Sequence, residues 1–183
     1  MTFGKFVRWW PPVGLLGMVL VGVAVGKGST TVDDAFQQAG RAGEPYTGWL
    51  LFFTDPRVLG VLWVGATAWA LWQRRWWLAA AVAVAPVVST EFERLCKQLF
   101  GRHKGHTLSY PSGHTALMVT VVGMVVVVAG AVLWSRVLAG VFAVLGMLGQ
   151  AFTYHYFTDT VGALFFASAL VCLVAWATEP APS

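Results

Sequence analysis

The sequence YPSGHTALMVTVVGMVVVVAG, residues 110–130, leads from a small polar turn directly into an apolar run. Such a run is typical of a membrane-spanning helix. Its N-terminus attracts anions, because free backbone N–H groups and the positive end of the helix dipole meet there. Gly113 allows a close backbone approach, and His114 can carry a proton near neutral pH. The turn therefore predicts a phosphate site at a membrane surface.

The composition of the chain is that of a membrane protein. Of its 183 residues, 57% are hydrophobic and only 11% are charged, whereas a soluble domain carries about 25% charged residues. We interpret residues 1–183 as one polytopic membrane domain. The net charge of +4 suits anionic lipids or an anionic substrate. The sequence contains no motif for binding nucleic acid.

Six apolar segments predict an all-α bundle of six transmembrane helices, because an open sheet would leave backbone groups unsatisfied in lipid. The segments cover residues 10–26, 57–72, 77–95, 113–134, 137–154 and 160–178. Residues 135–136 are expected to join the fourth and fifth segments. In the polar stretch 27–55, Thr31 is expected to cap a short extracytoplasmic helix, and residues 46–53 to lie in the interface. Residues 97–112 form a long charged loop.

Polar clusters lie at three helix ends that the alternating direction of the spans brings to one side of the membrane. They are residues 97–104, 111–114 and 155–159. Seven tryptophans are expected to gather at one interface as an aromatic belt: Trp9, Trp10, Trp72, Trp76, Trp77, Trp134 and Trp176. The cations are too evenly divided between the two sides to settle orientation. If the N-terminus is cytoplasmic, the clusters lie on the outer side of the membrane. An alternative interpretation of the first segment is a cleaved signal peptide instead of a membrane span.

With these clusters the chain resembles the type 2 phosphatidic acid phosphatase superfamily of integral membrane lipid phosphatases, over about residues 7–178. Its Pro-Ser-Gly-His motif matches in full at residues 111–114. Its Lys-x6-Arg-Pro motif matches at Lys97, with Lys104 and Gly105 in place of Arg and Pro.

The third motif of that superfamily, Ser-Arg-x5-His-x3-Asp, is matched only in part. His155 and Asp159 are present, whereas Leu148 and Gly149 stand in place of Ser and Arg. One phosphate-binding guanidinium is therefore missing, and no neutral side chain replaces its charge. Arg102 is the candidate to replace it in space.

The resemblance implies a metal-independent mechanism without a cofactor. His155 attacks phosphorus to form a phosphohistidine, Asp159 orients its imidazole, and His114 protonates the leaving oxygen and then activates water. The implied phosphate-binding groups are Lys97, Arg102, Lys104, Ser112 and Gly113. Lys97 has the alternative of pairing with Glu93 one turn earlier. The histidines of the loop match no zinc signature.

The resemblance implies a lipid phosphate or diphosphate as substrate, hydrolysed at the membrane interface. A cytoplasmic N-terminus places this reaction on the outer side, and the alanine-, valine- and tryptophan-rich composition favours a bacterial inner membrane. A polyprenyl phosphate or diphosphate is favoured, and phosphatidate and phosphatidylglycerol phosphate remain open. The missing arginine keeps two alternatives: a relative that binds lipid phosphates without hydrolysing them, and a structural subunit of a cell-envelope complex. A vanadate-dependent haloperoxidase shares the phosphate-site chemistry, but six membrane spans argue against it. The oligomeric state is left open.

Overall fold

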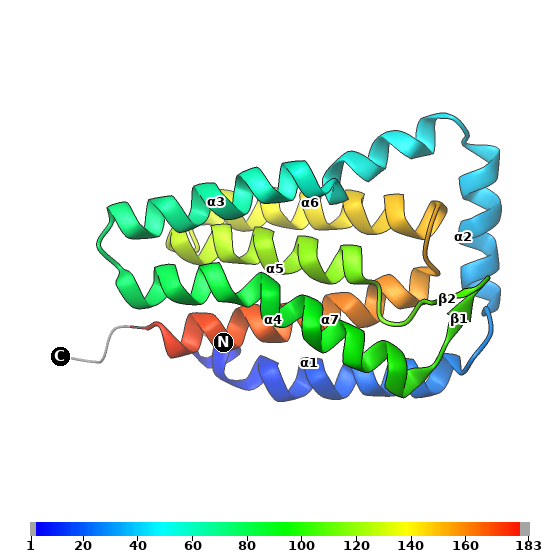
Figure 1. The fold of residues 1–183 in the computed structure, drawn as a ribbon, viewed down its shortest axis with the longest axis horizontal. Helices are drawn as coiled ribbons and strands as arrows, with labels where there is room; N and C mark the ends of the chain where they lie inside the picture. Colours follow the sequence, from blue (N-terminus) through cyan, green and yellow to red (C-terminus); the bar gives the residue numbers. More distant parts are fainter. Residues whose placement is uncertain (1–2, 180–183) are drawn as a thin grey trace.

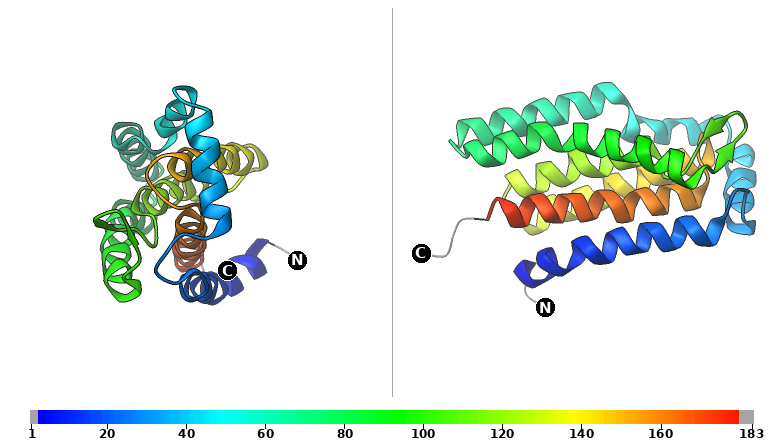
Figure 2. Two further views of the ribbon diagram at one scale, coloured as in Figure 1. Left: turned by 90° about the vertical axis from the view of Figure 1, so that its right-hand side faces the viewer. Right: turned by 60° about the horizontal axis from the view of Figure 1, so that its bottom comes forward.

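In the computed structural model, which describes residues 3–179, helices of similar length run side by side along the long axis (Figure 1). They are α1 (Phe3–Val25), α3 (Pro56–Trp72), α4 (Trp76–Phe100), α5 (Gly113–Val128), α6 (Leu133–Phe152) and α7 (Phe157–Ala177). A shorter helix, α2 (Thr31–Ala42), crosses one end of this bundle, as Figure 2 shows from that end. The expected all-α bundle is confirmed.

The remaining elements lie at the end of the bundle where α2 crosses it. The 3-10 helix η1 (Tyr46–Thr54) connects α2 to α3, and the strands β1 (His103–Lys104) and β2 (Thr107–Leu108) form a small antiparallel hairpin between α4 and α5. The first turns of α5 and α7 and the last turn of α6 reach the same end (Figure 1). All three polar clusters of the sequence therefore lie together there.

Four stretches of the described chain are long and apolar enough to cross a membrane: Gly4–Val25, Tyr46–Trp72, Leu133–Phe152 and Phe157–Ala177. Helix α5 is apolar but shorter, with 16 residues. The last turns of α4 carry Glu91, Glu93, Arg94 and Lys97, which lower its hydropathy. Length and composition thus support four of the six expected spans.

Helix α5 packs against α3, α4, α6 and α7. Its buried side chains include Met118, Val121 and Met124. Neighbouring helices come close where they carry glycine: a Cβ on Gly146 of α6 would lie 2.2 Å from the sulfur of Met118. The polar turn that precedes α5 is therefore held from inside the bundle.

Two expected boundaries are wrong. Helix α5 ends at Val128, and the chain turns at residues 129–132 rather than 135–136, which fall inside α6. The turn is marked by left-handed backbone at Gly130 and Ala131, with φ of 80° and 53°, but the apolar sequence around it conceals the break. Helix α4 extends to Phe100, so its last turn takes up the beginning of the expected charged loop.

Two polar caps set the ends of α2 and α3. Thr30, one residue before the expected cap, forms a capping box with Asp33: its hydroxyl accepts from the Asp33 N–H, and the Asp33 carboxylate accepts from the Thr30 N–H. Asp55 caps α3 by accepting from the N–H of Arg57, and Pro56 occupies the first turn.

The seven tryptophans of the expected belt lie in the helix turns at the end of the bundle away from α2: Trp9, Trp10, Trp72, Trp76, Trp77, Trp134 and Trp176. All except Trp10 are exposed. Their indole rings suit a membrane–water interface.

Candidate active site

His155 and Asp159 meet where α6 passes into α7. The backbone N–H of His155 donates to the carbonyl of Gln150 at 2.8 Å, which closes the turn after α6. The side chain of Asp159 is fully buried in the first turn of α7, and its Oδ2 accepts from the Tyr156 N–H at 3.2 Å. His155 Nδ1 lies 3.7 Å from that oxygen. The second ring nitrogen, Nε2, is therefore the one left for a substrate.

The turn before α5 is tied to the same carboxylate residue. The backbone N–H of Ser112 donates to the carbonyl of Asp159 at 3.1 Å, and the Ser112 hydroxyl accepts from the Thr115 N–H as the helix cap. His114 follows in the first turn of α5 and is exposed. Its ring centroid lies 6.2 Å from that of His155. The two imidazoles thus border one space at the end of the bundle.

Glu93 connects Lys97 to the N-terminus of α5. The buried Glu93 forms an ion pair with Lys97, and a Cβ on Gly113 would lie 2.8 Å from Glu93 Oε1. Only glycine leaves room for this carboxylate at position 113. Lys97 thus pairs with Glu93, as the alternative expected, and lies near the turn that carries His114. Its expected contact with phosphate stays a prediction.

Arg102 is completely buried and binds protein groups with every N–H group of its guanidinium. Nη1 donates to Asp159 Oδ1 and to Thr158 Oγ1, both at 2.7 Å. Nη2 donates to Asp33 Oδ2 at 2.7 Å and to the Gly28 carbonyl at 2.8 Å, while Nε donates to the same carbonyl at 3.1 Å. An arginine side chain has five N–H donors, so none is left for a phosphate.

The expected phosphate contact of Arg102 is therefore corrected to a structural one. Its guanidinium joins α2 to the first turn of α7, because it binds both Asp33 and Asp159. Burial raises the pKa of Asp33 and is the largest single influence. Hydrogen bonds from Thr158, Thr30 and Arg102 outweigh burial together, and the pKa lies below its ordinary value.

Lys104 lies on the carbonyl side of His155. Its Nζ donates to the His155 carbonyl at 3.1 Å and to the Thr153 carbonyl at 3.4 Å. Burial and the neighbouring charge of Arg41 lower the pKa of this amine, against the opposing influence of Asp159 and Asp33. The expected cation is thus close to the site, but its amine faces the backbone and not the imidazole of His155.

The place of the missing arginine is filled by η1. A Cβ on Gly149 would lie 2.7 Å from the backbone carbonyl of Leu50, so α6 and η1 are in contact and no larger side chain fits. The adjacent Gln150 is buried and donates to the hydroxyl of Thr54 at 2.7 Å. Neither residue offers a cation to the site.

Residues of α2 that the sequence analysis did not place in the site also reach it. Asp33 binds Arg102, and Gln37 Nε2 donates to the carbonyls of Ala151 and His155 at 2.6 and 3.1 Å. The capping box explains Asp33 locally and therefore hides its second role. The structure shows that this carboxylate is buried, and a buried carboxylate needs a partner, but the sequence around Asp33 does not report its burial.

Comparison with solved structures finds a protein of similar architecture. It is a transmembrane PAP2-type phosphatidylglycerolphosphate phosphatase from Bacillus subtilis, with a TM-score of 0.74 over 91% of this chain and 94% of that chain. This chain has the PAP2 fold. Sequence identity is 19%, no protein-family model matches the sequence, and no curated protein matches it either. The PAP2 fold therefore emerges from the arrangement of helices and not from overall sequence similarity.

Proposed function

We propose that the protein is an integral membrane phosphatase that hydrolyses a lipid phosphate or diphosphate. The observation that carries this proposal is the pair of imidazoles of His155 and His114, 6.2 Å apart at one end of an apolar bundle, with Asp159 behind His155. Two imidazoles on one space provide a nucleophile and an acid–base group. The PAP2 fold supports the same chemistry.

In the first step, Nε2 of His155 attacks phosphorus. A P–N bond forms as the bond to the leaving oxygen breaks, and His114 donates its proton to that oxygen. Asp159 lies at Nδ1 and stabilises the imidazolium, and their separation of 3.7 Å closes in the reacting complex, because catalytic hydrogen bonds commonly tighten there. Lys97 and the N–H groups after Ser112 stabilise the charge on the phosphoryl oxygens.

In the second step, water replaces His155 on phosphorus. Neutral His114 accepts a proton from the attacking water, the P–N bond breaks, and inorganic phosphate leaves with both histidines restored to their starting state. The mechanism uses the side chains described above and assigns no role to a metal ion.

We propose that the six long helices all cross the membrane, with α5 shielded by its neighbours, and that the site faces outward. Every acidic residue of the described chain except Glu179 lies at the end of the bundle that carries the candidate site. Their negative charges offset the positive side chains at that end. The opposite end carries a cluster of cations: Lys5, Arg8, Arg74, Arg75 and Arg136. An anionic cytoplasmic leaflet attracts such a cluster. A bacterial inner membrane fits this placement.

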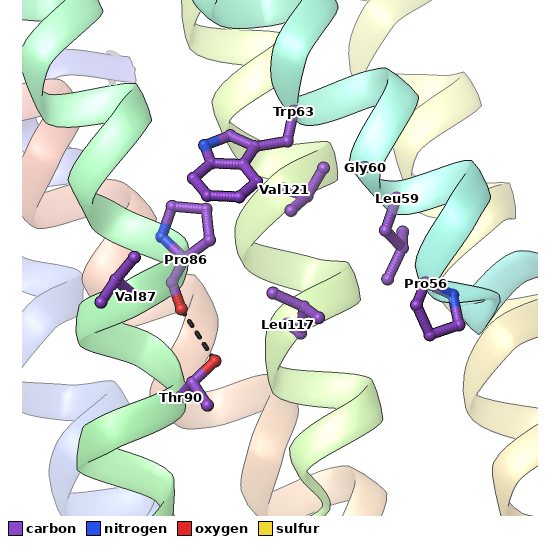
Figure 3. Close-up of a pocket in the computed structure, with 9 residues that line it drawn as sticks. All are labelled: Pro56, Leu59, Gly60, Trp63, Pro86, Val87, Thr90, Leu117 and Val121. Atoms are coloured by element: carbon purple, nitrogen blue, oxygen red, sulfur yellow. Dashed lines mark hydrogen bonds between the residues drawn. The ribbon is translucent and has the colours of Figure 1, made fainter.

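An apolar groove between α3, α4 and α5 offers a place for the lipid chain (Figure 3). Its volume is 280 Å³. Two of its walls lead toward the site: Leu117 lies one turn after His114, and Thr90 one turn before Glu93. The Thr90 hydroxyl donates to the Pro86 carbonyl at 2.9 Å, so it presents no free polar group to a hydrocarbon chain.

Filling this groove is expected to weaken the reaction of long-chain substrates. Gly60 lines the groove, and a Cβ there meets no atom within 4 Å, so Gly60→Leu fills the groove without a backbone clash. We expect kcat/KM for a long-chain lipid phosphate to fall about tenfold, as for other changes of one side chain in an apolar pocket. We expect kcat/KM for a short-chain analogue to stay unchanged.

The matched control is Gly65→Leu on the same helix. A Cβ at Gly65 also meets open space, but the position lines a different groove. Equal losses in the two variants, or a loss that does not depend on chain length, would show that the groove beside Gly60 does not hold the lipid.

The proposed function is tested by phosphate release from the purified protein in detergent. The substrates are polyprenyl diphosphate, polyprenyl phosphate, phosphatidate and phosphatidylglycerol phosphate, and the measured quantity is inorganic phosphate per protein per minute. We expect release from at least one lipid. A monodisperse, folded sample that releases phosphate from none of them contradicts the proposal and favours a protein that binds lipid phosphates without hydrolysing them.

A further inference from the structure

A polar cavity of 320 Å³ lies between α2 and the hairpin, next to the candidate site. The residues that line it all carry polar groups and include Asp34, Gln37, Arg41, Lys104 and Tyr156. The volume is within the range of small-molecule sites, about 300–1,000 Å³. The mechanism proposed above makes no use of this cavity.

The wall that α2 contributes is held in place from its other side. Asp34, Gln37 and Arg41 recur at a spacing of three and four residues, so they share one face of the helix. The ring of Phe36 stacks on Phe157 of α7 with centroids 4.1 Å apart, and Gly40 lies against the backbone of Phe152. These contacts with α6 and α7 therefore hold α2 in position as one wall of the cavity.

The cavity borders the nucleophile through three of its lining residues. Lys104 Nζ and Gln37 Nε2 each donate to the carbonyl of His155 at 3.1 Å. Tyr156 is the next residue of the chain, and its ring lies 5.1 Å from Lys104 Nζ. The cavity therefore lies beside His155, on the side of its backbone carbonyl.

The charge of the cavity is positive. It contains the cations of Arg41 and Lys104 and one carboxylate, that of Asp34. Within residues 3–179, no hydrogen bond or ion pair holds the guanidinium of Arg41, and Lys104 binds only backbone carbonyls. Burial lowers the pKa of Lys104, the carboxylates of Asp159 and Asp33 raise it, and the nearby charge of Arg41 also lowers it. The cations of Lys104 and Arg41 therefore repel each other. An anion between the two side chains relieves this repulsion.

We infer that this cavity binds a second, non-scissile phosphate of the substrate, and that Arg41 and Lys104 are its ligands. The inference rests on the proposed function and deepens it: the preferred substrates are lipids that carry another phosphate close to the one that is hydrolysed. Two lipid classes have this chemistry, a diphosphate and a phosphate joined through glycerol to a phosphodiester. Gly149 of α6 stands where the third motif has an arginine. In this arrangement Arg41 of α2 supplies a guanidinium in its place.

The test compares substrates in pairs that differ in the second phosphate. Polyprenyl diphosphate is paired with polyprenyl phosphate, and phosphatidylglycerol phosphate with phosphatidate. For each pair, kcat/KM for the substrate with the second phosphate is divided by kcat/KM for the substrate without it. This ratio is measured for Arg41→Gln and for the unchanged protein. Arg41→Gln removes a charged hydrogen-bond donor, so we expect it to lower the ratio about tenfold or more in at least one pair.

Two further variants make the result specific. Arg41→Lys keeps the charge and is expected to restore part of the ratio. Arg57→Gln removes an exposed arginine at the same end of the bundle, outside the cavity, and is expected to leave both ratios unchanged. The pair that responds to Arg41→Gln identifies the source of the second phosphate.

The outcomes separate this inference from the proposed function. Hydrolysis by the unchanged protein with no effect of Arg41→Gln on either ratio overturns the inference and leaves the phosphatase proposal standing. An equal effect of Arg57→Gln also overturns it, because the effect is then one of net charge. Absence of hydrolysis by the unchanged protein overturns both.

Discussion

His155→Gln is expected to lower phosphate release by about a thousandfold or more, the scale of loss when an enzyme loses its nucleophile. Gln keeps a polar side chain in the turn after α6 but cannot form a P–N bond. The measurement is phosphate release from the lipid that the unchanged protein hydrolyses best. Retention of a tenth of the activity would show that another group attacks phosphorus.

The same mechanism gives a different result for His114→Gln. With 4-nitrophenyl phosphate, whose leaving group departs without a proton, the first step continues while the second loses its base. Phosphorylated protein should therefore accumulate, stable to alkali and labile to acid, and a burst of nitrophenol should precede slow turnover. His106→Gln is the control, because His106 lies exposed in the turn of the hairpin. Neither effect should appear in that variant.

Arg102→Met is expected to destabilise the protein by about 3–5 kcal/mol, because it leaves two buried carboxylates without their cation. Asp33 and Asp159 both have an exposure of 0%. In detergent, the midpoint of thermal unfolding should fall by about 10 °C for a chain of this length. If this variant does not accumulate, Asp33→Asn provides the measurement, with a smaller loss, because it removes one of the two carboxylates and nearly conserves volume.

The chain contains a matched control for this prediction. Arg94 and Glu91 form an exposed ion pair on α4, with 63% and 60% of their side chains accessible. Exposed pairs contribute less than about 1 kcal/mol, so Arg94→Met should leave the unfolding midpoint nearly unchanged. Equal midpoints for Arg102→Met and Arg94→Met would show that the buried network does not stabilise the fold.

The sequence predicts the arrangement of the helices better than the partners of individual side chains. Alternating apolar segments determine which helix ends meet, so His114, His155 and Asp159 are expected at one end, and the structure places them there. The exact ends of α4 and α5 are harder to predict, because the apolar sequence continues through the turn at Gly130. Length and composition support four spans, because the last turns of α4 carry ionisable residues and α5 has only 16 residues.

Arg102 shows why the remainder of the site cannot be predicted from the sequence. Arg102 is a cation two residues before Lys104 in a chain that lacks the arginine of the third motif, which suggests a phosphate ligand. The acceptors that it binds instead lie 69 and 57 residues away, at Asp33 and Asp159. Only the position of α2 across the bundle brings them together. The contact of Gly149 with Leu50 depends in the same way on packing that no local pattern reports.

The guanidinium of Arg102 also ties the assembly of the site to the order of synthesis. Its acceptors belong to segments made at the two extremes of translation, Gly28 and Asp33 before it and Thr158 and Asp159 after it. Until α7 has been made and inserted, the guanidinium has only half of its acceptors and His155 has no carboxylate beside it. A chain that stops before α7 therefore leaves the cation of Arg102 incompletely neutralised.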